Sequence, residues 1–211
     1  MPGTFRKPND YDDVKVGGDF RPLPKGGYVV RIAKAEATES SGGVPMIHIA
    51  YDIAEGEYAN YFTDLYKNRK ARSERPFEVK YPFEGQKWIL VYDRDGKTNR
   101  DFKGFCTALE DSGTKVWMPN GEFNVNALNG AKVGLVFRRE ENEYQGKYTW
   151  RTMPWRFRSV DVIRKGDVFV PEDKAIERNT APTIQPGMTY SYNTPSDISD
   201  SFSAASDDIP F

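Results

Sequence analysis

Flat aromatic rings and cationic side chains alternate within one stretch of twelve residues, KYTWRTMPWRFR, at positions 147–158, which holds no acidic residue. Aromatic rings stack on unpaired bases and cations contact phosphates, so this is the chemistry of a platform for single-stranded nucleic acid. A long amphipathic strand with core aromatics and solvated arginines has the same composition, and the stretch alone does not separate the two. The candidate binding residues are Lys147, Tyr148, Trp150, Arg151, Trp155, Arg156, Phe157 and Arg158.

The face that this stretch presents depends on its register. Side chains of an extended strand alternate between two faces, so unbroken alternation places Tyr148 and Trp150 together. Trp155 and Phe157 then lie on the opposite face. Pro154 cannot donate a hydrogen bond to a neighbouring strand, which favours a sheet edge or a bulge. Because a bulge moves the second half of the stretch across, the sequence leaves open which face meets solvent.

A second cationic run, at positions 66–75, reads YKNRKARSER and contains a single acid, Glu74. A run of charge is usually a solvated loop, and we expect one at these positions. The alternative is a flexible loop that contacts phosphates. The candidate phosphate contacts in this run are Lys67, Arg69, Lys70 and Arg72.

Size and composition limit the class of protein. The chain has 211 residues, of which 38% are hydrophobic and 29% charged, which is typical of one domain with polar extensions. No apolar run approaches the roughly 20 residues that span a bilayer. The N-terminus has no apolar core, so no signal peptide is predicted. With a single cysteine the chain cannot form an internal disulfide, and we expect a cytoplasmic protein without membrane contact.

Charge is divided unevenly along the chain. Residues 1–171 carry a net charge of +4 and residues 172–211 a net charge of -5. A basic body followed by an acidic tail indicates an anionic ligand for the body and a separate role for the tail. Residues 179–206 are dominated by Ser, Thr, Pro, Asn and Asp, so we expect this part of the tail to be disordered.

Hydrophobic periodicity predicts a mainly β body. Strands are expected at 28–38, 44–53, 86–93, 131–139 and 147–158, the last with a possible extension at 159–163. Residues 57–66 fit either a strand or a short helix. A helix is expected at 101–112, with Asp101 as its N-cap. Residues 140–146 are expected to form a hairpin loop.

The predicted order is three strands, one helix and two strands. This is the element order of the OB-fold, a five-stranded Greek-key barrel that binds ligands across strands two and three and the neighbouring loops. We therefore expect an OB-fold-like barrel with one helix between strands three and four. The predicted domains are an arm at 1–26, the OB-like body at 27–171 and a disordered acidic tail at 172–211.

The last residues of the chain resemble the C-terminal tip of bacterial single-stranded DNA-binding proteins. The shared tip reads Asp207-Asp208-Ile209-Pro210-Phe211. In that family an acidic tip of this kind docks into pockets on replication and repair proteins. Phe211 offers a ring and the chain-end carboxylate, and capture of a terminal carboxylate is a recurring mode of peptide recognition. The resemblance implies that these five residues dock onto replication or recombination proteins.

A second resemblance covers most of the body. Segments at 51–58, 102–112, 133–141 and 158–167 are similar to a family of phage-encoded proteins of Gram-positive hosts, labelled as of unknown function or as single-stranded DNA-binding proteins. This resemblance implies a role in phage DNA metabolism within the bacterial cytoplasm. The long arm and the long loop before the fourth strand depart from the bacterial pattern. The oligomeric state is therefore left open, a homo-oligomer included.

Signals for an enzyme are weak. His48 and Cys106 are the single residues of their types, Cys106 lies among apolar residues of the predicted helix, and no phosphate-binding glycine motif occurs. Carboxylates gather near Asp52 and near Glu140, but in sequence they are typical of hairpin-loop charges. We predict a protein that is not an enzyme and uses no cofactor or metal. The predicted function is binding of single-stranded DNA and recruitment of partner proteins; a protein-interaction module that does not bind nucleic acid is the alternative.

Overall fold

The computed structural model describes residues 6–9 and 21–177. The chain divides into two units, Met1–Ile176 and Glu177–Phe211, and the strands and helices named below all belong to the first unit. The predicted disorder at 179–206 and the predicted docking tip at 207–211 lie outside the described residues. No helix in the described part of the chain is long and apolar enough to cross a membrane.

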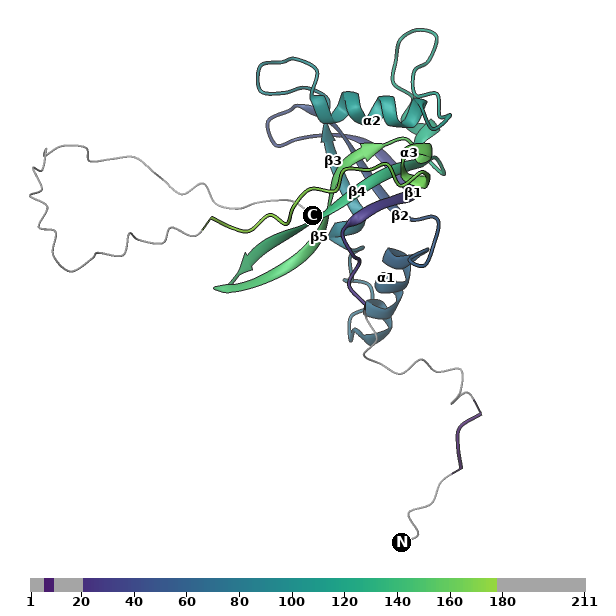
Figure 1. Ribbon diagram of the computed structural model, residues 1–211, viewed down its shortest axis with the longest axis vertical. Coiled ribbons are helices and arrows are strands. Elements are labelled where there is room, and N and C mark those ends of the chain that lie inside the picture. The colour runs from purple at the N-terminus through teal and green to yellow at the C-terminus, as the bar shows by residue number, and fades with distance from the viewer. Residues whose placement is uncertain (1–5, 10–20, 178–211) are drawn as a thin grey trace, which may run out of the picture. The chain divides into compact units, whose positions relative to one another are not determined.

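The fold is mainly β and is built on one antiparallel sheet (Figure 1). The five strands are β1 Gly26–Glu39, β2 Pro45–Ile53, β3 Gln86–Leu90, β4 Lys132–Tyr144 and β5 Lys147–Arg158. The helices are α1 Tyr61–Arg72, α2 Arg100–Glu110 and α3 Val160–Arg164, with short 3-10 turns η1 Phe83–Gly85 and η2 Val125–Leu128. The strands and α2 follow the order that the sequence predicts.

The strands lie in the order β3-β2-β1-β4-β5, with β3 and β5 at the two edges. A five-stranded barrel of the OB type closes where these two edges meet, and α2 lies between β3 and β4 in sequence, as in that fold. Among the described strands no backbone ladder joins β3 to β5, so the sheet is not a closed barrel. Figure 1 shows α2 across one end of the sheet and α1 at the opposite end.

The core lies on the inner face of the curved sheet. Ile49, Ile53, Leu135 and Phe137 are fully buried there, as the strand periodicity predicts. On α2, Phe105 packs its ring against Phe157 of β5, with the ring centres 4.6 Å apart. This helix therefore covers one end of the core with the apolar stripe read from its sequence.

A close approach on the outer side of the sheet fixes α3. A side chain at Gly134 would place its first carbon 2.8 Å from the carbonyl oxygens of Arg158 and Ser159 and into the side chain of Ile163. Only glycine leaves room for the chain to turn from β5 into α3 at this point. Ser159 caps α3 by accepting a hydrogen bond from the Val162 N–H. The predicted extension of the fifth strand at 159–163 is therefore wrong.

The basic run also differs from the prediction. Residues 61–72 form α1, so Lys67, Arg69, Lys70 and Arg72 lie on a helix and not on the expected loop. The residues from Leu65 onward are mostly good helix formers, and three cations in the last turn complement the helix dipole. The ambiguous segment at 57–66 is thus a turn followed by the start of this helix.

Two smaller predictions need correction. The N-cap of α2 is Asn99, whose side-chain oxygen accepts the Asp101 N–H at 2.8 Å, so Asp101 lies inside the helix. The loop predicted at 140–146 is a two-residue turn, because β4 continues to Tyr144 and β5 begins at Lys147. Gln145 and Gly146 both have positive φ, 52° and 73°, as a tight hairpin turn requires.

Candidate nucleic-acid interface

A bulge in β5 sets which side chains of residues 147–158 share a face. Pairing with β4 passes from Pro154 opposite Phe137 to Arg156 opposite Val136, which leaves Trp155 as the extra residue. The bulge moves the second half of the strand across, which is the alternative that Pro154 left open. As a result, Tyr148 and Trp150 share the inner face with Phe157, and Arg156 turns to the outer face.

Phe157 is part of the core and is not a stacking residue in this structure. Its side chain is 4% exposed and lies between the ring of Phe105 and the ammonium of Lys87, which is 5.7 Å from its ring centre. The sequence-based assignment of Phe157 to the binding platform is therefore wrong. The reason is the register shift at Trp155, which points Phe157 inward beside Leu135.

The inner face of the β4–β5 hairpin changes character beyond Phe137. There β4 and β5 run past the end of β1, and the hairpin projects from the rest of the sheet (Figure 1). The next inner residue on β4 is Arg139, whose guanidinium carbon lies 5.1 Å from the centre of the Trp150 ring. Trp150 itself is 41% exposed. Along the inner face of the hairpin, Arg139 and the exposed indole of Trp150 therefore come directly after the buried core.

The end of the predicted N-terminal arm closes one side of this region. Leu23 is buried, its N–H donates to the hydroxyl of Tyr61 at 3.0 Å, and its carbonyl accepts from the Thr152 hydroxyl at 2.6 Å. Leu23 thus connects α1 to β5. Residues 21–25 of the arm belong structurally to the body.

A buried carboxylate positions α1. Asp52, at the end of β2, accepts hydrogen bonds from the N–H groups of Phe62 and Thr63, each at 2.9 Å. These are two of the backbone donors that the first turn of a helix leaves without an internal partner. The acceptor replaces a local cap, because the N-cap residue Asn60 makes no side-chain capping bond. Asp52 therefore fixes where α1 starts and how it meets the sheet.

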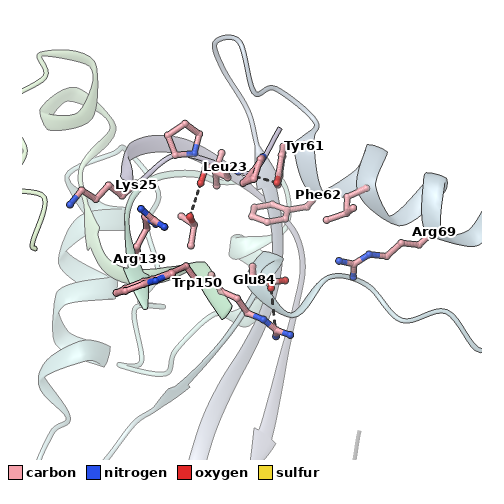
Figure 2. A pocket seen from close by; sticks show the side chains of 13 residues that line it. Leu23, Lys25, Tyr61, Phe62, Arg69, Glu84, Arg139 and Trp150 are labelled. Carbon is pink, nitrogen blue, oxygen red and sulfur yellow. Dashed lines mark hydrogen bonds and ion pairs between the residues drawn. The ribbon is translucent and has the colours of Figure 1, made fainter. Parts of the chain in front are cut away.

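An open groove of about 680 Å³ lies between α1 and the hairpin. Figure 2 shows Arg69 on the α1 side and Trp150 with Arg139 on the hairpin side, with Leu23 and Phe62 between them. The two cationic segments predicted from sequence, far apart in the chain, thus line one groove. The lining residues are Pro22, Leu23, Pro24, Lys25, Tyr61, Phe62, Leu65, Arg69, Glu84, Arg139, Trp150, Arg151 and Thr152.

The charge of the groove is mainly positive. Its lining contains four cations, Lys25, Arg69, Arg139 and Arg151, against one acid, Glu84. Arg151 lies 3.9 Å from Glu84. A lining of this sign around an exposed indole suits an anionic ligand that carries flat rings.

Several predicted residues lie outside the groove. On the hairpin, Lys147 and Tyr148 are exposed beside the turn. Arg156 stacks its guanidinium on Trp155 at 4.5 Å, and the Trp155 ring meets that of Phe169. Arg158 donates to the carbonyl of Phe157 at 2.9 Å. On α1, only Arg69 lines the groove, whereas Lys67, Lys70 and Arg72 are exposed elsewhere on the helix.

Sequence reasoning missed two groups of residues. Arg139 falls where the alternation through Leu135 and Phe137 places the next inward side chain, so an inward cation was readable from the pattern. The second group is centred on Trp88 of β3, which is 42% exposed. It stacks between the rings of His48, at 4.5 Å, and Phe83, at 5.6 Å.

The residues weighed for catalysis have structural contacts. Glu55 accepts hydrogen bonds from Arg164 and Lys132, and the Arg164 guanidinium is the larger cause that lowers the pKa of Glu55 to about 2. Burial raises the pKa of the Cys106 thiol to about 11. The described residues contain no group of three or more His, Cys, Asp or Glu side chains placed to hold a metal ion.

Comparison with models of protein families gives a match to part of the chain. A family model described as "Protein of unknown function (DUF669)" matches residues 9–76. That segment includes β1, β2 and α1, and so it supplies the α1 wall of the groove but not the β4–β5 hairpin. No curated protein matches the chain.

Proposed function

We propose that this chain binds single-stranded DNA in the groove between α1 and the β4–β5 hairpin. The observation that supports this most is the arrangement of Trp150 and Arg139 on one wall opposite Arg69 on the other. An exposed ring offers a surface for an unpaired base, and the surrounding cations offer partners for the phosphates on either side of it. Among the residues that line the groove the one acid is Glu84, and it lies near Arg151.

The ligand class follows from the kind of surface. Stacking on Trp150 requires a base that is not paired and stacked within a duplex. Contacts with phosphates give affinity that is independent of sequence and that falls with salt. We therefore expect binding to unpaired strands with little base preference. Tyr148, which is 44% exposed and on the same face as Trp150, extends the stacking surface towards the hairpin turn.

A fluorescence titration with oligothymidine tests this function. Binding quenches the indole emission of Trp150, and added salt restores it. Because the chain has four tryptophans, the Trp150→Phe variant is titrated in parallel and should lose most of the quenching while it still binds. A duplex of the same length serves as the competitor control. If no oligothymidine binds at low salt, the proposal is wrong, and a protein-interaction module becomes the better explanation.

The last five residues, 207–211, are proposed to recruit replication or recombination proteins of the host cytoplasm. The support is their resemblance to the tip of bacterial single-stranded DNA-binding proteins and the negative charge of residues 172–211. Deletion of 207–211 should leave affinity for oligothymidine equal or slightly higher, because an acidic segment competes for a basic groove. It should also abolish binding to a helicase, primase or recombination protein that the intact chain binds. If the shortened chain still binds that partner, the tip does not have this role.

A further inference from the structure

A short segment after α3 returns to β4 and pairs with it beyond the end of β1. The Lys174 N–H donates to the carbonyl of Arg139 at 2.9 Å, and the Glu141 N–H donates to the carbonyl of Lys174 at 2.8 Å. The Ile176 N–H then donates to the Glu141 carboxylate, so the backbone pairing stops there. We name residues 172–176 the strap. The body therefore continues to Ile176, past the boundary at 171 predicted from composition.

The strap places a carboxylate on two cations of the groove. Asp173 lies 2.6 Å from the Lys25 ammonium through one oxygen and 3.4 Å from the Arg139 guanidinium through the other. Arg139 is also the cation that covers the ring of Trp150. The Asp173 carboxylate thus bridges two cations directly beside the exposed indole. A nucleotide whose base stacks on Trp150 would bring its phosphate into this neighbourhood.

We propose that Lys25 and Arg139 form a phosphate subsite of the groove, and that Asp173 is an internal occupant which a DNA phosphate displaces. The inference rests on the proposed function of the groove. Carboxylate and phosphate oxygens accept hydrogen bonds from the same cationic donors. All three side chains are partly exposed, so each ion pair is weak and a phosphate can replace the carboxylate.

Displacement has two consequences. A wild-type chain must break the Asp173 contacts before a phosphate binds, which lowers its affinity. The strap also loses its side-chain anchors when DNA binds and keeps only its backbone contacts with β4 and the Ile176–Glu141 contact. DNA binding should therefore loosen residues 172–176, although most other parts of the groove become more ordered.

The first experiment compares Asp173→Asn with Glu172→Gln, an exposed neighbour that loses the same charge. Asp173→Asn should bind oligothymidine about two- to fivefold more tightly at low salt, the range expected for removal of exposed ion pairs. Its plot of log affinity against log salt should keep the slope of the wild type, because a phosphate occupies the subsite in both bound states and only the cost of displacing Asp173 differs. If the two variants agree in affinity, Asp173 is not an occupant of the subsite.

The second experiment follows amide hydrogen exchange in the strap. Without DNA, the Lys174 amide should exchange faster in Asp173→Asn than in Glu172→Gln. In the wild-type chain, the same amide should exchange faster with saturating oligothymidine than without DNA. Slower exchange with oligothymidine would contradict displacement. A wild-type chain that binds oligothymidine normally while Asp173→Asn behaves like Glu172→Gln overturns this inference alone. A wild-type chain that binds no oligothymidine overturns the proposed function and this inference together.

Discussion

The Lys87 ammonium of β3 donates a hydrogen bond to the carbonyl of Trp155 on β5 at 3.1 Å. It also lies 3.4 Å from the carbonyl of Pro154. These two carbonyls belong to the bulge, where the regular hydrogen-bond ladder between β4 and β5 is interrupted. A single side chain therefore connects the two edge strands of a sheet that no backbone ladder closes. Burial of its ammonium group lowers the pKa of this lysine.

Lys87→Met tests whether this contact holds the sheet edges together. Methionine keeps most of the apolar length but removes the donor, so the carbonyls of Pro154 and Trp155 lose their partner. We expect the free energy of unfolding to fall by about 1–3 kcal/mol, the usual cost of an unsatisfied buried polar group. Urea denaturation measures the change. Lys97→Met, which removes an exposed ammonium, is the control and should unfold as the wild type does; equal midpoints for both variants would exclude the bridge.

The lowered pKa of Glu55 predicts how the stability of the folded protein depends on pH. The Glu55 carboxylate accepts hydrogen bonds from Arg164 of α3 and from Lys132 of β4. The shortest of these hydrogen bonds, from Arg164, measures 2.7 Å. Its pKa is lowered from 4.5 to about 2, first by the hydrogen bond from Arg164. A carboxyl group with a lowered pKa in the folded state contributes stability above about pH 4.5, and that contribution is lost as pH falls towards about 2.

Glu55→Gln should therefore be less stable than the wild type at pH 7, and the difference should shrink between about pH 4.5 and 2. Urea midpoints at several pH values in this range measure it. Glu57→Gln is the matched control, because Glu57 has only a long contact of 3.6 Å with Arg21. A constant difference between Glu55→Gln and the wild type across the range would show that the Arg164 contact does not set this pH dependence.

Periodicity predicted the strands and α2 because their burial repeats regularly along the chain. It could not place Phe157, since one extra residue at Trp155 moves the later side chains of β5 to the opposite face of the sheet. Pro154 gave the signal that a bulge was possible, but not its position. The register becomes visible only from the partner strand, where Val136 and Phe137 have neighbours on β5 that are two residues apart.

The helix α1 was harder to predict because its support comes from elsewhere in the chain. The backbone N–H groups of its first turn donate to Asp52, which lies ten residues before Phe62. Phe62 itself packs against Tyr51 and Phe137 of the sheet. A window over the basic run at 66–75 contains neither Asp52 nor Phe62. The groove has the same origin, since Arg69 and Trp150 are far apart in the chain and line one groove only in the folded structure.

Replacement of Trp150 tests the stacking surface. Trp150→Ala should weaken oligothymidine binding by about 1–3 kcal/mol, the value of one stacked base, and Trp150→Phe should recover much of it. Trp117→Ala, which removes an indole exposed to a similar degree outside the groove, is the control. Affinity is measured by anisotropy of a labelled oligonucleotide, so that loss of the indole does not affect the signal. A folded Trp150→Ala variant that binds as tightly as the wild type would remove Trp150 from the site.

Arg69 and Arg72 allow the groove to be separated from the general charge of α1. Both are cations in the last turn of the helix, and only Arg69 lines the groove. Arg69→Gln should make the slope of log affinity against log salt shallower by about 0.7, because one phosphate contact is lost. Arg72→Gln removes the same charge and the same favourable interaction with the helix dipole, so its slope should match that of the wild type. Equal slopes for the two variants would show that the α1 wall acts only through its long-range field and that phosphates do not contact Arg69.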